Sequence, residues 1–232
     1  MIKLIALGQK KADISREQYS RHWREVHAPL VQRISCLRRY VQSHRLPQGM
    51  PDSLPDTPPA PYDGVAEVWC DDLQTALSLS ENPEYLEGAY LDEPNFAVPN
   101  MPFLLTTENV VVPGPKLEKD TDGVKAIVLA KRKPGLSVEE FQAYWRDTHA
   151  PLVPKTPGLR RYVQCHLVPE MYANGEPAFD GVAELTWPDL AAFEKGWTSQ
   201  EMQVEQFTDV RNFIDLKKIC GLLATEVRII WP

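Results

Sequence analysis

Apolar and polar positions recur along the chain with two different periods, which predict strands and helices in turn. Residues 2–8 form a short apolar run that we interpret as a strand. A capping box begins at Ser15, with Gln18 three residues later, and predicts the N-terminus of a helix there. One face of this helix carries residues at spacings of four, four and three: Tyr19, Trp23, His27 and Leu30.

The proline after Ala28 restricts the residue before it, so we expect His27 to lie in the last turn of the helix. Alternating residues then predict strands over 37–44 and 63–69. A second helix is predicted over 73–91 and a final strand over 105–112. The order of elements is therefore β-α-β-β-α-β.

The same unit is written twice. A shift of 122 residues aligns 23–44 with 145–166, and 14 of these 22 positions are identical. Downstream the shift falls to 117, because a proline-rich loop at 46–61 is longer in the first copy. Strands are predicted again over 125–130 and 223–230. The capping box and the helical face recur as Ser137, Glu140, Phe141, Trp145, His149 and Leu152.

The repeat predicts two domains, 1–112 and 124–232, joined by a polar Pro/Gly linker at 113–123. A βαββαβ unit folds as a ferredoxin-like antiparallel sheet with helices on one face. The other face must be covered too, because the strands are apolar or functional on both sides. We therefore predict an α+β fold in which two ferredoxin-like units pack sheet to sheet as one α/β barrel within the chain.

Side-chain alternation in the predicted strands suggests which face carries chemistry. The small set Gly64, Ala66 and Val68 suits close packing against helices. That leaves five residues for the barrel-lining face: Tyr40, Gln42, His44, Asp63 and Glu67. The corresponding residues of the second copy are Tyr162, Gln164, His166, Asp180 and Glu184.

If His44 lies opposite Asp63 in a hairpin, Tyr40 falls opposite Glu67. A histidine bonded to a carboxylate suits acid–base work near neutral pH, and a tyrosine can donate to a developing oxyanion. The alternative is that these groups only satisfy one another structurally. In the second copy the corresponding pairs are His166 with Asp180 and Tyr162 with Glu184. The candidate catalytic residues are therefore the histidines, aspartates and tyrosines of these pairs, together with the motif histidines: His44, His166, Asp63, Asp180, Tyr40, Tyr162, His27 and His149.

His27 and His149 also have a structural interpretation, as core residues bonded to a backbone carbonyl near a helix C-terminus. Trp23 and Trp145 are expected as core anchors that also border the site. The candidate substrate-binding residues are Gln42, Gln164, Glu67, Glu184, Trp69, Trp23 and Trp145.

Composition narrows the classes of partner. A net charge of −7 and a pI near 5.3 argue against nucleic acid and anionic membranes. The four cysteines lack CxxC spacing and are expected as reduced thiols of a cytoplasmic protein. The sequence contains no P-loop, no GxGxxG after a strand, no GxSxG and no HExxH. We expect a small-molecule substrate, no cofactor and no metal.

The doubled motifs resemble the EthD family of the dimeric α/β-barrel superfamily. The resemblance is carried by "WREVHAPLV" from Trp23, the strand ending at His44, and Asp63-Gly64. The second copy carries it equally, with "WRDTHAPLV" from Trp145. The family's members are mostly single units that dimerise, whereas this chain is a tandem fusion. The resemblance implies a pseudo-dimer within one chain, which could assemble further as a homo-oligomer.

Relatives that the resemblance brings in include a monooxygenase accessory protein, polyketide decarboxylases and dehydratases, cofactor-independent monooxygenases and lactone isomerases. They share no single catalytic set, so only the histidines at 27 and 149 carry over. Our first hypothesis is a cofactor-independent lyase acting by His/Asp chemistry on a small hydrophobic or aromatic hydroxy/keto compound. The alternatives are a non-catalytic binding or accessory protein and a cofactor-independent monooxygenase.

Overall fold

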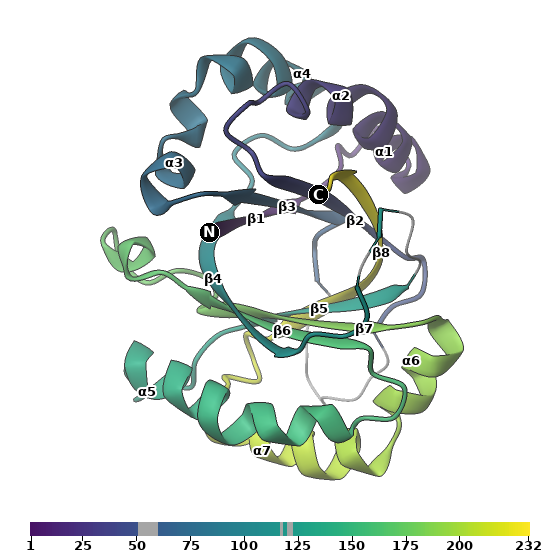
Figure 1. Cartoon of the computed structure of the whole chain (residues 1–232), viewed down its shortest axis with the longest axis vertical. Coiled ribbons are helices and arrows are strands. Elements are labelled where there is room, and N and C mark those ends of the chain that lie inside the picture. Colours follow the sequence, from purple (N-terminus) through teal and green to yellow (C-terminus); the bar gives the residue numbers. More distant parts are fainter. Residues whose placement is uncertain (51–59, 117, 120–122) are drawn as a thin grey trace.

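The computed structural model describes residues 1–50, 60–116, 118–119 and 123–232, and it contains one closed barrel of eight antiparallel strands. The strand order around the barrel is β1-β3-β2-β8-β5-β7-β6-β4. Figure 1 shows the helices of the first repeat on one side of the barrel and those of the second repeat on the other. The predicted α+β fold with an intrachain barrel is confirmed. Parts of the predicted loop at 46–61 and linker at 113–123 lie outside the described residues.

Each repeat supplies four strands and one layer of helices. The strands of the first repeat are β1 (Ile2–Gly8), β2 (Arg39–Arg45), β3 (Gly64–Cys70) and β4 (Phe103–Val112). Its helical segments are α1 (Arg16–His22), η1 (Trp23–His27), α2 (Ala28–Val31), α3 (Leu73–Leu77), η2 (Leu79–Glu81), η3 (Tyr85–Ala89) and α4 (Tyr90–Phe96). The single helix predicted over 73–91 is therefore broken into shorter segments and ends later.

The second repeat follows the same order. Its strands are β5 (Val124–Ala130), β6 (Arg161–Leu167), β7 (Gly181–Trp187) and β8 (Cys220–Ile230). Its helical segments are α5 (Val138–Ala143), η4 (Tyr144–His149), η5 (Ala150–Lys155), η6 (Pro169–Tyr172), α6 (Leu190–Trp197), η7 (Glu201–Gln206) and α7 (Phe207–Phe213). Both predicted capping boxes are present, at Ser15 and Ser137.

The final strand of each repeat closes the barrel. β4 pairs with β1 of its own repeat and with β6 of the other, and β8 pairs in the same way with β5 and β2. Two hydrogen-bonded seams therefore join the repeats. The barrel interior buries apolar residues from both, including Ile5, Leu7, Ile127 and Leu129. Among the described helices, none is long and apolar enough to cross a membrane.

The predicted strand register is wrong by one residue. His44 lies opposite Gly64 and Tyr40 opposite Val68, not opposite Asp63 and Glu67. Because side chains alternate between the two faces of a strand, an offset of one residue exchanges the faces of β2. The side chains predicted to line the barrel therefore lie on the helix-covered side. The second repeat pairs His166 with Gly181 and Tyr162 with Leu185. The residues predicted to line the barrel but found on the helix-covered face are Tyr40, Gln42, His44, Tyr162, Gln164 and His166.

The indole of Trp23 explains this arrangement. A Cβ added to Gly64 would lie 2.5 Å from the indole ring, so only glycine admits the ring against the strand. The ring of His44 packs on the same indole at 4.7 Å between centroids, and the Gln42 amide donates to the Trp23 carbonyl at 2.8 Å. Trp23 therefore holds β2 and β3 in register from the helix side.

The helix that carries His27 does not end there, contrary to expectation. α1 continues through the π-helical turn η1 into α2, with the Ala28 N–H donating to the Trp23 carbonyl. Pro29 is the second residue of α2 and follows directly on the π-helical turn. His27 therefore lies in mid-helix rather than at a helix C-terminus, and its ring packs against Phe96 of α4 at 5.0 Å between centroids.

Candidate active site

A cavity of about 340 Å³ lies between the helices of the first repeat and the outer face of its sheet. Its volume is within the range of small-molecule sites. Three of the predicted site residues line it together: Trp23, His27 and Tyr40. The rest of its wall is mainly aromatic and aliphatic.

The equivalent space in the second repeat measures only about 70 Å³. The helix N-caps Asp72 and Asp189 show that a shift of 117 aligns the two helical layers. At this shift Ala76 corresponds to Phe193, and Ser80 to Trp197. Phe193 and Trp197 are buried, with ring centroids 5.4 Å apart. These large rings fill the second repeat, so the two candidate sites are not equivalent.

His27 is joined to a carboxylate that the sequence analysis did not single out. Its Nδ1 lies 3.1 Å from Oδ2 of Asp92, whose Oδ1 lies 2.9 Å from Nε2 of His22. The Asn95 amide donates to the same Oδ1 at 3.1 Å. Burial opposes ionisation of Asp92, but the bonds from Asn95 and the two histidines hold its pKa below the usual range.

The His27–Asp92 dyad has the polarity of a general base. Burial lowers the pKa of His27, and the bond to Asp92 only partly offsets this effect, so the ring is neutral at neutral pH. With the carboxylate accepting from Nδ1–H, the lone pair resides on Nε2. Among the described residues, Nε2 of His27 has no hydrogen-bond partner. An unpaired basic nitrogen therefore belongs to the cavity wall.

Tyr40 supplies a donor to the same cavity. Its hydroxyl oxygen accepts from Nε1 of Trp23 and from Nε2 of Gln42, both at 2.9 Å. Both contacts use the oxygen as acceptor, so the hydroxyl proton remains available. Burial raises the pKa of Tyr40, and the group stays protonated.

His44 and Asp63 do not form the predicted pair. Nε2 of His44 lies 3.1 Å from Oε1 of Gln42, and burial lowers the pKa of His44 to about 4. Asp63 accepts from the backbone of Lys10 and from Nε of Arg16. His44 is therefore bonded to Gln42, and Asp63 to Lys10 and Arg16, in place of the predicted bond between His44 and Asp63.

The second repeat shows the same departure. His166 lies 3.3 Å from Gln164, whereas Asp180 is bonded to Arg132 and paired with Lys131 at 3.0 Å. His149 keeps a dyad, with Nδ1 2.9 Å from Oδ2 of Asp209.

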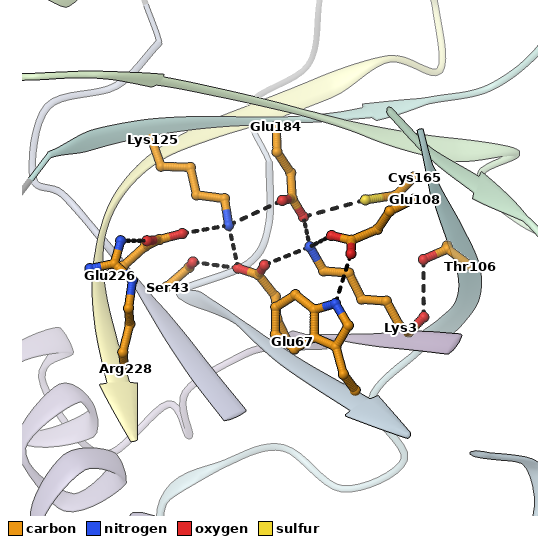
Figure 2. Close-up of polar contacts among 11 residues, drawn as sticks. Lys3, Ser43, Glu67, Thr106, Glu108, Lys125, Cys165, Glu184, Glu226 and Arg228 are labelled. Carbon is orange, nitrogen blue, oxygen red and sulfur yellow. Dashed lines mark hydrogen bonds and ion pairs between the residues drawn. The ribbon is translucent and has the colours of Figure 1, made fainter. Parts of the chain in front are cut away.

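Glu67 and Glu184 point into the barrel (Figure 2). Neither they nor Trp69 belong to the wall of either cavity. Lys3 Nζ lies 2.8 Å from Glu67 and 2.5 Å from Glu184. Lys125 Nζ lies 2.6 Å from Glu67 and 3.3 Å from Glu184. Each lysine therefore bridges one glutamate from each repeat, and this buried square joins the two halves.

Burial would raise the pKa of Glu67, but Lys125 and Lys3 overcome it and hold the pKa below its usual range. Burial and the charge of Glu67 raise the pKa of Glu184. The indole of Trp69 donates to Glu108 at 2.9 Å. Glu67, Glu184 and Trp69 are thus all bonded inside the barrel. Their geometry favours a structural role over the predicted role in substrate binding.

Metal-ligand atoms gather at one place in the described part of the chain, where Glu108, Cys165 and Glu184 lie within 4.8 Å of one another. The ammonium of Lys3 already lies between the two carboxylates, 3.4 Å from Glu108. In the cavity wall of the first repeat, the described imidazole and carboxyl groups are those of His27 and Glu93.

Asp92 is not among the predicted site residues because its signal lies in the less periodic second helix. The signal exists: "DEPNF" from Asp92 recurs as "DVRNF" from Asp209 at the shift of 117. In both copies an aspartate stands three residues before an Asn-Phe pair, and in both it is the partner of the repeated histidine: Asp92 of His27 and Asp209 of His149.

The barrel, with a cavity between each sheet and its helices, defines a dimeric α/β-barrel protein condensed into one chain. The family model for the EthD domain matches residues 11–100 and 133–217, once in each repeat. The chain belongs to the EthD family. No curated protein matches it.

Solved structures share the fold at low sequence identity. An anthrone oxidase-like protein is 9% identical with a TM-score of 0.67, over 97% of this chain and 91% of that one. A putative monooxygenase from Fusobacterium nucleatum is 9% identical with a TM-score of 0.58, over 98% and 92%. A mutant chlorite dismutase from Candidatus Nitrospira defluvii is 13% identical with a TM-score of 0.55, over 98% and 92%. At these identities the likeness concerns the fold alone.

Proposed function

We propose that the first repeat is a small-molecule enzyme site in which His27 acts as general base on an aromatic hydroxy or keto compound. The observation that carries the proposal is the His27–Asp92 dyad in the wall of the 340 Å³ cavity, with Nε2 unpaired among the described residues. A neutral imidazole fixed by a carboxylate is matched to proton abstraction near neutral pH. The aromatic wall suits a ring-bearing substrate.

The reaction begins with transfer of a proton from a substrate O–H, or from carbon next to a carbonyl, to Nε2 of His27. The electron pair moves toward the substrate oxygen, and the free O–H of Tyr40 donates to that oxygen as charge develops. In a lyase the resulting enolate or phenolate expels a leaving group, and His27 returns its proton to that group. Elimination balances in this way. C–C cleavage starts instead from deprotonation of a substrate hydroxyl: the alkoxide becomes a carbonyl as the adjacent C–C bond breaks, and His27 gives its proton to the carbanion that leaves.

A second candidate starts from the same deprotonation. A phenolate or enolate in the cavity can react with dioxygen, and this alternative is favoured by structural neighbours named anthrone oxidase-like protein and putative monooxygenase. Their identity of 9% keeps this observation at the level of an analogy. The third candidate is a binding protein, in which the dyad only orients a ligand.

One experiment separates the three. A panel of aromatic hydroxy and keto compounds, including anthrone, is incubated with the protein under air and under argon, with products analysed by mass spectrometry and dioxygen by electrode. A lyase turns over equally in both atmospheres, and a monooxygenase consumes dioxygen and stops under argon. A binding protein retains ligands without product. Equal turnover by wild type and His27→Gln would overturn the assignment of His27.

A further inference from the structure

A second polar pair, Tyr85 and Glu93, lies in the wall of the first-repeat cavity. The Tyr85 hydroxyl comes from η3 and donates to Oε1 of Glu93 in α4 at 2.7 Å. Among the described residues, the other carboxyl oxygen of Glu93 has no hydrogen-bond partner. Glu93 therefore offers a free acceptor in a wall that is mainly aromatic and aliphatic.

This pair belongs only to the repeat that has room for a ligand. At the shift of 117, Tyr85 corresponds to Met202 and Glu93 to Val210. Both counterparts line the small space of the second repeat. The dyad is thus present in both repeats, whereas the Tyr85–Glu93 pair accompanies the open cavity. This difference argues that the pair serves a ligand rather than the fold.

The charges of the cavity wall are unbalanced. Among the described lining residues, Glu93 is the one carboxyl group, and neither lysine nor arginine lines the cavity. Burial raises the pKa of Glu93, and the neighbouring Asp92 adds to this effect, while the bond from Tyr85 opposes it. An anionic ligand would find an acid and no cation in a low-dielectric space.

We propose that the Tyr85–Glu93 pair determines specificity, holding a hydroxyl group of an uncharged aromatic substrate and excluding substrates that carry a carboxylate. The inference rests on the proposed function, since it assumes that the cavity binds the substrate. The free oxygen of Glu93 accepts from the ligand hydroxyl, while Tyr85 keeps the carboxyl in place. A ligand carboxylate cannot donate to this oxygen, and it meets a group of its own polarity.

The test uses four fluorescent or ultraviolet-absorbing probes with one ring system: naphthalene, 2-naphthol, 2-naphthoate and 2-(aminomethyl)naphthalene. Binding is measured by titration at neutral pH, where the last two are an anion and a cation. We expect 2-naphthol to bind about tenfold more tightly than naphthalene and 2-naphthoate about tenfold more weakly than 2-naphthol. Tightest binding of the cation, or equal binding of the naphthol and the naphthoate, would overturn the proposal.

Glu93→Gln keeps the size of the side chain and the acceptor for Tyr85 but removes the ionisable group. We expect this variant to lose about tenfold of its discrimination against 2-naphthoate and to change 2-naphthol affinity by less than about threefold. The control is Glu87→Gln, which removes an exposed carboxylate of η3 outside the cavity wall and should leave all four affinities unchanged. Unchanged discrimination in Glu93→Gln, with an unaltered melting temperature, would also overturn the proposal.

Failure of the proposed function gives a different result. If no probe binds wild type, or if Ala76→Phe leaves binding intact, then the first-repeat cavity is not the ligand site. If the probes bind in the cavity without regard to hydroxyl or charge, the cavity stands and the specificity assignment alone falls.

Discussion

Nδ1 of His27 lies 3.1 Å from Oδ2 of Asp92, although 65 positions separate the two residues in the chain. The first comes from a π-helical turn of the repeated HAPL motif and the second from the helix that precedes β4. Packing of these two helices against one sheet brings the base and its orienting carboxylate together beside the cavity.

Replacement of the orienting carboxylate should impair the base without emptying the cavity. Asp92→Asn permits the amide to donate to Nδ1, which places the ring proton on Nε2 and removes the lone pair from the cavity. We expect kcat to fall about 100-fold or more with a small change in KM. Steady-state kinetics on a turned-over panel compound measures this effect, and Asp209→Asn serves as the matched control with unchanged kinetics.

The acid limb of the rate profile should report the same dyad. Burial lowers the pKa of His27 from 6.5, and the base works only when unprotonated. The kcat/KM of wild type should therefore decrease as pH falls below 6.5 through the lowered pKa. An acid limb centred above 6.5 would show that His27 is not the titrating base.

The two aromatic side chains that fill the second repeat should block the first cavity when they are introduced at the equivalent positions. Ala76→Phe and Ser80→Trp place in the first repeat the rings that Phe193 and Trp197 provide in the second. We expect these variants to fold and to weaken probe binding at least about 100-fold, since the rings occupy the ligand's volume. Gln74→Trp, on the exposed surface of α3, is the control. Intact binding in both cavity variants would contradict this account.

The buried square inside the barrel should carry much of the stability at the junction of the repeats. Lys3→Met leaves the carboxylates of Glu67 and Glu184 with one lysine in a dry interior, and we expect a loss of about 3–5 kcal/mol. Urea unfolding measures it. Addition of Glu184→Gln should recover part of the loss, because one buried charge is removed with its partner.

An exposed ion pair provides the comparison. Arg38→Met breaks the contact with Asp71, in which both side chains are about half exposed. The free energy of unfolding should then be nearly unchanged. A loss as large as that of Lys3→Met would show that burial of the square is not the cause.

Stability should fall in acid because of two buried histidines. Burial lowers the pKa of His44 and of His166 from 6.5 to about 4, so the unfolded chain binds their protons first. Their contribution to the free energy of unfolding is present in full above pH 6.5 and is lost as the pH falls toward 4. The loss is on the order of a few kcal/mol. The double variant His44→Gln/His166→Gln should have a flatter stability profile over this interval. An unchanged slope would contradict the prediction.

Local signals in the sequence predicted elements well and long-range placement less well. The capping boxes at Ser15 and Ser137 and the order of strands depend on neighbouring residues and are confirmed. The offset between β2 and β3 depends on how the Trp23 ring packs against Gly64, which alternation alone does not encode. One residue of slip moved His44 away from Asp63 and onto the helix side.

The candidate site could be predicted only in part for a related reason. His27, Trp23 and Tyr40 were selected, and the structure brings them to one cavity. Asp92 lies in a helix interrupted by π-helical and 3₁₀ turns, whose periodicity gave no clear face. The closure of the second cavity depends on the volumes of Phe193 and Trp197, and these acquire meaning only when the two helical layers are superposed.

The proposed working site lies in the first repeat, at the His27–Asp92 dyad. The most direct measurement compares the turnover of His27→Gln and His149→Gln on the same substrate, since both variants remove a histidine paired to aspartate from equivalent helices. We expect turnover to fall about 100-fold or more in His27→Gln and less than about twofold in His149→Gln. Equal losses in the two variants, or a larger loss for His149→Gln, would contradict it.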